Sequence, residues 1–232
     1  MSDPILIGHR GAMAEITENT LASFARAVDV GAAMVEFDVH LSADGKAVVI
    51  HDPTIDRVAD DSSPIRSGTV VDLPWSALAT VVLRGGHAIP SLDEVLDFVD
   101  VPMLLEIKAP AAVEAVLAAV RGRDIDWALS RIISFRTEAL TRVRELAPAL
   151  PIAPITTTVD EEYWVLADRL RAETISTVHW ESVPAAVVDR AHDTGRTVTA
   201  GGLGLEDLAL FRRIGIDGFC TDDPRTVADD LR

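Results

Sequence analysis

The sequence contains little cysteine and no long hydrophobic run, and each absence excludes a class of protein. The single cysteine among 232 residues, Cys220, excludes an intramolecular disulfide framework. No stretch of about eighteen apolar residues is present, so a transmembrane helix is not expected. The first residues, MSDPILIGH, lack the basic and apolar regions of a secretory signal. These absences predict a protein that acts in the cytoplasm without integral membrane association.

Positive charge is also scarce. The 21 Lys and Arg residues face 37 Asp and Glu residues, which gives a formal net charge of −16. Such a surface repels nucleic acid and anionic membranes, so neither is expected as a partner. Only Lys46 and Lys108 among the basic residues are lysines. This preference for arginine over lysine is typical of a bias in genomic composition. Lys108, however, lies inside the apolar run LLEIKAP, where a solvated surface lysine is not expected.

Strand-like apolar runs alternate with helix-periodic segments along the chain. Eight strand–helix units with short connections are typical of a parallel (β/α)8 TIM barrel, and an open doubly wound sheet is the alternative. No linker or low-complexity segment divides the chain, so residues 1–232 are predicted to form one domain. The predicted strands lie at about 4–8, 33–40, 101–107, 130–135, 150–155, 174–179, 196–200 and 216–221.

The second unit departs from this pattern. ADG at residues 43–45 predicts a hairpin turn between two apolar strings, and no helix pattern follows until residue 91. Residues 52–89 are rich in proline and glycine and are too long for an ordinary barrel loop. We expect them to form a small insertion or lid over the barrel mouth.

Charged residues stand two positions apart near the ends of two predicted strands. Because residues i and i+2 of a strand face the same way, VEFDV directs Glu36 and Asp38 to one side, and LLEIKAP does the same for Glu106 and Lys108. Buried carboxylates are costly unless they are paired or bind a metal. Lys108 offsets one of the three, and Mg²⁺ or Ca²⁺ would accommodate the others. A salt-bridge network at the strand ends is the alternative.

Two histidines also follow apolar runs, His9 in ILIGHRGA and His51 in VVIHDP. Either one alone is explained better as a core residue with its hydrogen bonds satisfied. Beside a carboxylate cluster, the pair instead indicates a general acid and a general base for a phosphoryl displacement. Arg10 and Lys108 would then hold the nonbridging oxygens of the phosphate.

In their order along the chain, these segments resemble the glycerophosphodiester phosphodiesterase family, and the resemblance covers nearly all of the sequence. The segments that carry it are HRG at 9–11, TENTLASFARAVDVGA at 17–32, EFDVHLSADGKAVVIHDPTIDR at 36–57, IPSLDEVL at 89–96, EIK at 106–108, ISF at 133–135 and GIDGFCTDDP at 215–224. The short HRG segment is unspecific alone, whereas the ordered set is specific.

The resemblance implies a metal-dependent barrel that hydrolyses a small-molecule glycerophosphodiester to sn-glycerol 3-phosphate and an alcohol. It implies one divalent cation, which would be Mg²⁺, Ca²⁺ or Mn²⁺. The family's acid/base pair corresponds to His9 and His51. The other site residues that the resemblance implies are the metal ligands Glu36, Asp38 and Glu106 and the phosphate-binding Arg10 and Lys108.

The sequence departs from the family pattern in two places. Where the family usually has Pro-Glu-Asn-Thr, this chain has TENT. Asn19 and Thr20 are both candidates for the N-cap of the helix that follows, and we interpret Asn19 as a helix N-cap rather than a site residue. Where the family usually ends its seventh strand on a Trp-Thr-Val-Asn-like string, this chain has VTAGGLG. Glycines 201, 202 and 204 predict open space and a backbone free to adopt positive φ, unless residues 52–89 or Trp180 fill the gap. A bulkier substrate or a weak, permissive activity is then expected; ordinary loop glycines are the alternative.

Three functions are compatible with these residues. The first is a hydrolase, and the second is a lyase in which a neighbouring substrate hydroxyl expels the alcohol and a cyclic phosphate is released. The third is a noncatalytic phosphodiester-binding barrel, which predicts the loss of a catalytic histidine, whereas both are present. Among the other histidines, His40 and His179 are candidates for the barrel mouth, and His192 is expected at the surface. The sequence does not predict the oligomeric state.

Overall fold

The computed structural model describes residues 3–178, 183–202 and 204–231. In this part of the chain, eight parallel strands follow one another around a barrel, and β1 closes it by pairing with both β11 and β2. The predicted (β/α)8 TIM barrel is therefore confirmed. The barrel strands are β1 (Ile5–Gly8), β2 (Met34–Leu41), β6 (Met103–Ile107), β7 (Arg131–Ser134), β8 (Ile152–Thr156), β9 (Thr174–Thr177), β10 (Thr197–Gly201) and β11 (Gly218–Thr221).

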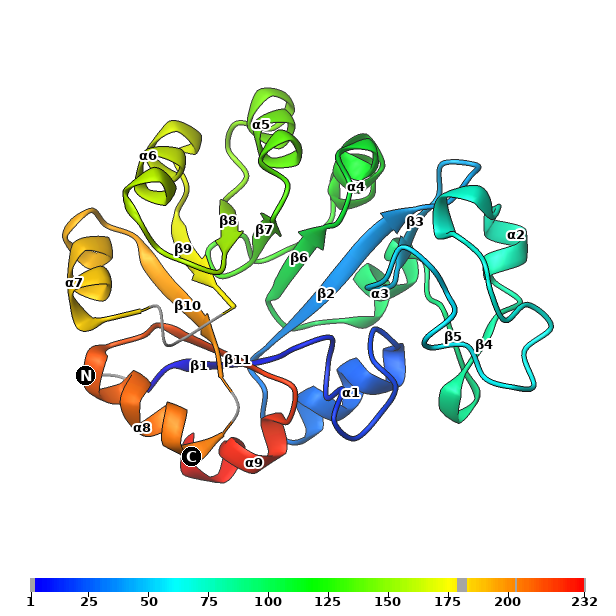
Figure 1. The fold of residues 1–232 in the computed structure, drawn as a ribbon, viewed down its shortest axis with the longest axis horizontal. Helices are drawn as coiled ribbons and strands as arrows, with labels where there is room; N and C mark the ends of the chain where they lie inside the picture. Colours follow the sequence, from blue (N-terminus) through cyan, green and yellow to red (C-terminus); the bar gives the residue numbers. More distant parts are fainter. Residues whose placement is uncertain (1–2, 179–182, 203, 232) are drawn as a thin grey trace.

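Helices connect these strands and cover the outside of the barrel (Figure 1). Their ends follow local sequence signals, as in the capping box that Ser91 and Glu94 form at the start of α3. Gly215 ends α8 in the left-handed region, at φ 82°. No described helix is long and apolar enough to cross a membrane. The main helices are α1 (Leu21–Asp29), α3 (Leu92–Phe98), α4 (Val113–Val120), α5 (Thr137–Leu146), α6 (Glu161–Leu170), α7 (Ala185–Asp193), α8 (Leu205–Ile214) and α9 (Pro224–Ala228).

The alternation of side chains along the strands determines what fills the barrel. One apolar cluster inside it contains Ile7, Met34, Leu104, Ile133 and Ala153, contributed by five different strands. The opposite faces of the strands pack against the helices in the main core. Since every second residue returns to the same face, the positions two and four after Met34, and two after Leu104, lie above this floor. Those positions carry the acidic residues that the sequence singled out.

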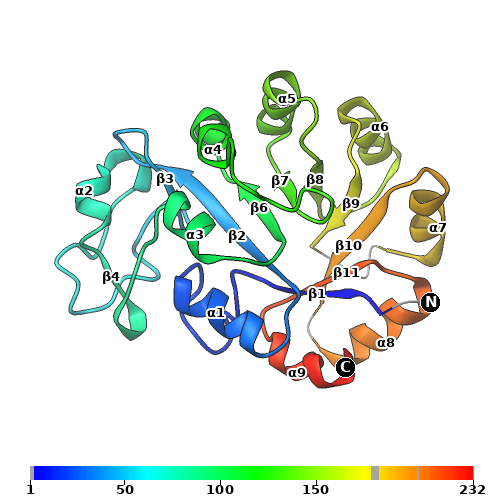
Figure 2. The ribbon, with the colours of Figure 1, turned by 180° about the vertical axis from the view of Figure 1, so that it is seen from behind.

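Residues 52–89 pack beside β2 and the short β3 (Ala47–Val49), which runs antiparallel to β2 (Figures 1 and 2). This insertion contains η1 (Val70–Asp72), α2 (Trp75–Leu78), β4 (Val82–Leu83), η2 (Arg84–Gly86) and β5 (His87–Ala88). Apolar side chains of the insertion and of the preceding β3 segment together form a second, smaller core. The members of that core include Ile50, Ile55, Val58, Val70, Leu78, Val81, Leu83 and Ile89. A lid function for the insertion stays a prediction.

Candidate active site

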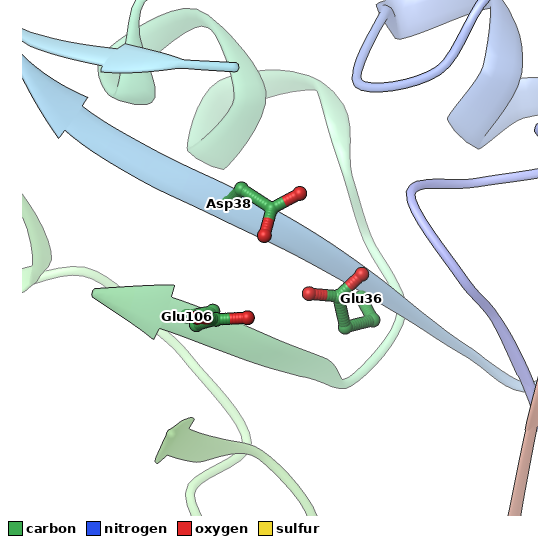
Figure 3. Close-up of side chains that lie close together, drawn as sticks. All are labelled: Glu36, Asp38 and Glu106. Carbon is green, nitrogen blue, oxygen red and sulfur yellow. The ribbon is translucent and has the colours of Figure 1, made fainter. Parts of the chain in front are cut away.

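Three buried carboxylates meet above the apolar floor of the barrel. Glu36 and Asp38 lie on β2, and Glu106 lies on β6 directly opposite Asp38 in the strand register (Figure 3). One carboxylate oxygen from each residue lies within 4.8 Å of those of the other two. The three residues are only 4%, 1% and 6% exposed. The strand alternation therefore brings together the predicted acidic cluster.

Burial and mutual repulsion shift the pKa values of these carboxyl groups. Burial raises the pKa of Glu36 to about 8, and the charge of Asp38 adds to the effect. Burial likewise raises the pKa of Glu106 to about 7, although Lys108 opposes the shift. Burial alone would also raise the pKa of Asp38, but Lys108 and Arg10 outweigh it, and that pKa is lowered. The cluster thus lacks enough internal positive charge to ionise fully at neutral pH.

The cations beside the cluster leave one buried oxygen unsatisfied. Lys108 Nζ lies 2.9 Å from Oε1 of Glu106 and 3.2 Å from Oδ1 of Asp38. The second approach lacks hydrogen-bonding geometry, so Oδ1 of Asp38 has no hydrogen bond among the described residues. Lys108 thus offsets the charge at this oxygen without a hydrogen bond, and a buried carboxylate oxygen that accepts no hydrogen bond can bind a further cation. A divalent cation that prefers oxygen ligands fits this cluster better than a salt-bridge network alone, in which Oδ1 of Asp38 accepts no hydrogen bond.

His9 lies at the end of β1, beside the same cluster. Its Nδ1 is 2.5 Å from Oδ1 of Asp222, and its Nε2 is 3.9 Å from Oε2 of Glu36. Burial lowers the pKa of His9, but the contact with Asp222 and the charge of Glu36 outweigh it, so the pKa is raised. Asp222 fixes the orientation of the ring and directs Nε2 towards the carboxylates.

His51 follows β3 and has a carboxylate partner of its own. Its Nδ1 is 2.7 Å from Oδ1 of Asp52, which leaves Nε2 available for a ligand. Burial lowers the pKa of His51 by more than Asp38 and Asp52 raise it. The two histidines thus share one arrangement, in which Nδ1 contacts a carboxylate, but their pKa values move in opposite directions.

The backbone of the HRG segment directs one N–H to the cluster and explains why residue 11 is a glycine. Arg10 has φ 51°, in the left-handed region, and its N–H donates to Oε2 of Glu36 at 3.0 Å. The Arg10 guanidinium lies between acidic groups, with Nη1 3.0 Å from Glu18 and Nε 3.4 Å from Asp38. Gly11 has φ 84°, and a Cβ there would lie 2.4 Å from Oγ of Ser23. Only glycine fits at that position.

The interpretation of Asn19 as a helix N-cap is wrong. Thr20 caps α1, because its hydroxyl accepts a hydrogen bond from the backbone N–H of Ser23. Asn19 has φ 56°, and its side chain bonds Asp38 twice. Nδ2 donates to Oδ2 of Asp38 at 2.8 Å, and Oδ1 accepts from the Asp38 backbone N–H at 3.2 Å. Asn19 therefore orients one of the three carboxylates.

A cavity of about 400 Å³ opens beside the cluster, and its two walls differ in chemistry. Leu104, Ile133 and Ile155 form an apolar wall, whereas Ser176 and Thr199 contribute hydroxyl groups from β9 and β10. The polar end carries His9, Glu36, Glu106 and Asp222. No Lys or Arg lines the cavity in the described part of the chain. His179 and Trp180, which the sequence suggested for the mouth, lie outside the described residues.

The glycines at the end of β10 and after it differ from expectation. None of Gly201, Gly202 and Gly204 has a positive φ. A Cβ on Gly201 would lie 2.9 Å from the carbonyl oxygen of Val178, and one on Gly202 would lie 2.5 Å from the Phe219 ring. Only at Gly204, the N-cap of α8, would a Cβ meet nothing within 4 Å, although the backbones of Gly201 and Gly202 also line the cavity. At the other two positions glycine allows neighbouring segments to pack closely.

Two other described histidines, His40 and His192, lie at the edge of the site and away from it, respectively. His40 Nε2 contacts the backbone carbonyl oxygen of His51 at 3.0 Å, so it supports the segment that carries the catalytic candidate. His192 is exposed on α7 and contacts Asp217 at 2.9 Å, as expected for a surface residue. The sequence did not single out Glu18, Asp52, Arg57 or Asp222, although all four lie in the segments that carry the family resemblance.

Comparisons with known proteins agree with this geometry. A family described as "Glycerophosphoryl diester phosphodiesterase family" matches residues 9–226. A curated glycerophosphodiester phosphodiesterase from Caldanaerobacter subterraneus subsp. tengcongensis is 29% identical over 98% of this chain and 98% of the relative. An Oleispira antarctica phosphodiesterase, solved with the product sn-glycerol-3-phosphate, has a TM-score of 0.87 at 24% identity and covers 98% of this chain and 97% of its own. A glycerophosphodiester phosphodiesterase from Thermotoga maritima has a TM-score of 0.79 at 27% identity, with 100% of each chain covered.

Proposed function

The chain belongs to the glycerophosphoryl diester phosphodiesterase family of phosphoric diester hydrolases, and from this premise we propose that it hydrolyses glycerophosphodiesters to sn-glycerol 3-phosphate and an alcohol with the help of one divalent cation. The family resemblance inferred from the sequence is confirmed. One observation carries the proposal beyond family membership. Three buried carboxylates with an unsatisfied oxygen lie next to a histidine whose Nδ1 is held by a carboxylate.

Glu36, Asp38 and Glu106 would hold the cation, and Asn19 would fix the orientation of Asp38. When bound, a divalent cation supplies positive charge against the phosphate oxygens, which lowers the cost of the charge that develops in the displacement. Mg²⁺, Ca²⁺ and Mn²⁺ all accept carboxylate ligands, so the ligand set is compatible with each of them. Zinc is disfavoured because its sites in proteins are rich in Cys and His.

His9 and His51 would move the protons. An in-line displacement at phosphorus requires a base that takes a proton from the attacking group and an acid that gives one to the leaving oxygen. Each histidine has its Nδ1 against a carboxylate and can exchange a proton at Nε2. Arg10 and Lys108 lie at the edge of the cluster and would contact the nonbridging oxygens of the phosphate.

The cavity beside His9 would take one of the two organic groups of the diester. Its hydroxyl wall suits the hydroxyl groups of a glycerol, and its apolar wall suits the carbon chain. The cytoplasmic location and the small-molecule substrate that the sequence predicts are part of the same proposal.

Product analysis tests the reaction directly. The protein would be incubated with glycerophosphocholine in ¹⁸O-labelled water and followed by phosphorus NMR. Hydrolysis predicts sn-glycerol 3-phosphate as the first product, with ¹⁸O in its phosphate. A cyclic phosphate that appears first would establish the lyase mechanism instead. Saturable binding without turnover, in protein loaded with Mg²⁺, Ca²⁺ or Mn²⁺, would establish a noncatalytic barrel.

A further inference from the structure

Arg57 in the insertion joins two parts of the site that are far apart in the sequence. Its Nη1 lies 2.6 Å from Oε2 of Glu18, and its Nη2 lies 2.7 Å from Oε1 of the same carboxylate. Its Nε lies 2.6 Å from Oδ2 of Asp52. One guanidinium thus binds two carboxylates from different segments of the chain. This use of three donors requires the planar, forked shape of arginine.

Each of the two carboxylates also contacts a proposed active-site residue. Oδ1 of Asp52 contacts Nδ1 of His51 at 2.7 Å, while its other oxygen binds Arg57. Oε1 of Glu18 accepts from Nη1 of Arg10 at 3.0 Å and from Arg57 as well. The result is a continuous chain of contacts, from Arg10 through Glu18, Arg57 and Asp52 to His51.

The side chains in this chain of contacts differ in how far they are exposed to solvent. The Glu18 side chain is 8% exposed, and that of Asp52 is 24% exposed, whereas that of Arg57 is 46% exposed. Without Arg57, Asp52 would lose its only described cationic partner besides the His51 ring. Glu18 would keep Arg10 as its one cationic partner among the described residues.

We propose that Arg57 is a positioning residue, which orients His51 through Asp52 and Arg10 through Glu18. This inference rests on the proposed function, because the roles of His51 and Arg10 come from it. It also assigns a role to the insertion. The insertion supplies the guanidinium that fixes the positions of His51 and Arg10 relative to each other. A displaced acid, base or phosphate ligand lowers the rate even when the fold is intact.

Steady-state kinetics of Arg57 variants test this role, with Arg66→Ala as a matched control. Arg66 lies in the same insertion, where it pairs with Asp61 and interacts electrostatically with Asp60, and neither of these residues belongs to the proposed site. Arg57→Ala is expected to lower kcat by about 10–100-fold and to raise KM, because the contacts of Arg57 with both Asp52 and Glu18 are lost. Arg57→Lys keeps the charge but contacts fewer oxygens, and it should fall between the alanine variant and the wild type. Arg66→Ala should keep wild-type kinetics.

Two further measurements separate positioning from general stabilisation. Free guanidinium ion at millimolar concentration should restore part of the turnover of Arg57→Ala, because the site of Arg57 is half open to solvent. In the Asp52→Asn background, the loss of kcat on Arg57→Ala should be much smaller than in the wild type. Thermal melting and metal content of every variant show whether it is folded and loaded.

The outcomes decide the inference separately from the proposed function. Wild-type kinetics in folded Arg57→Lys and Arg57→Ala would overturn the inference while leaving the hydrolase intact. Fully additive losses in the Asp52→Asn background, or losses that only follow melting temperature, would also overturn it. If Arg57→Ala fails to fold, Arg57→Lys alone carries the test. Inactive wild type and inactive Arg66→Ala would instead contradict the proposed function.

Discussion

Nδ1 of His9 lies 2.5 Å from Oδ1 of Asp222, although 213 positions separate the two residues in the sequence. The contact exists because β1 and β11 are neighbours that close the barrel. It places a carboxylate behind the ring and directs Nε2 towards Glu36. Residues near the two ends of the chain thus together position one of the two histidines that are proposed to transfer protons.

Asp222→Asn should lower turnover and lower the pKa of His9. The contact with Asp222 raises the pKa of His9 against the effect of burial, so a neutral amide removes that support. We expect a smaller loss of kcat than for removal of the histidine itself. NMR titration of the ring and the pH dependence of kcat measure both effects. An unchanged His9 pKa would show that the contact is structurally incidental.

His9→Ala and His51→Ala should each reduce kcat by about 10²–10⁴-fold, which is the usual contribution of a positioned acid or base. Fold and metal content should survive, because neither ring belongs to the three-carboxylate cluster. A substrate with an activated leaving group should restore the variant that lost the acid, and only that one. A variant with near-normal turnover would identify its histidine as structural.

Cation binding should release protons near neutral pH. In the cation-free protein, burial holds the pKa of Glu36 at about 8 and that of Glu106 at about 7. Both groups therefore carry protons below these values, and a cation must displace them. Affinity should rise as pH increases from about 6 to about 8 and then level off. Calorimetry at pH 7 in two buffers of different ionisation enthalpy counts the protons. Zero release would contradict the burial of uncompensated carboxylates.

Gly201→Ala should destabilise the fold by about 1–3 kcal/mol, a typical cost of overpacking. A Cβ at this position would lie 2.9 Å from a backbone oxygen, which cannot move as a flexible side chain can. Gly204→Ser is the matched control, because that position has open space, and serine is a good helix N-cap. Urea unfolding compares the two. Equal urea midpoints for the two variants would show that the backbone around Val178 can shift at little cost in stability.

The sequence predicts well those parts of the site that depend on strand alternation. Glu36, Asp38 and Glu106 meet because a period of two brings them to the same side of neighbouring strands. Closure of the barrel is also predictable from eight repeated units. The irregular insertion of residues 52–89 carries no such period, so the position of Arg57 relative to Glu18 could not be foreseen.

Local patterns also misled in specific ways. Asn19 stands where N-caps are common, but its left-handed backbone turns the side chain to Asp38, and the neighbouring Thr20 takes the cap. Gly201 and Gly202 were expected to leave open space and do line the cavity, but the close approach of Val178 and Phe219 is what requires glycine at these positions. In both cases the decisive contact comes from a residue at least seventeen positions away, which no local rule can include.

Metal reconstitution with product analysis tests most sharply whether the three buried carboxylates serve a cation. Wild-type protein and Asp38→Asn would be stripped with chelator, verified as metal-free by elemental analysis, and assayed on glycerophosphocholine before and after addition of Mg²⁺, Ca²⁺ or Mn²⁺. We predict that the metal-free wild type is inactive and regains turnover with about one bound cation per chain. Asp38→Asn should bind the cation weakly and stay nearly inactive. Full turnover by the verified metal-free wild type would contradict a role for Glu36, Asp38 and Glu106 as ligands of a catalytic cation.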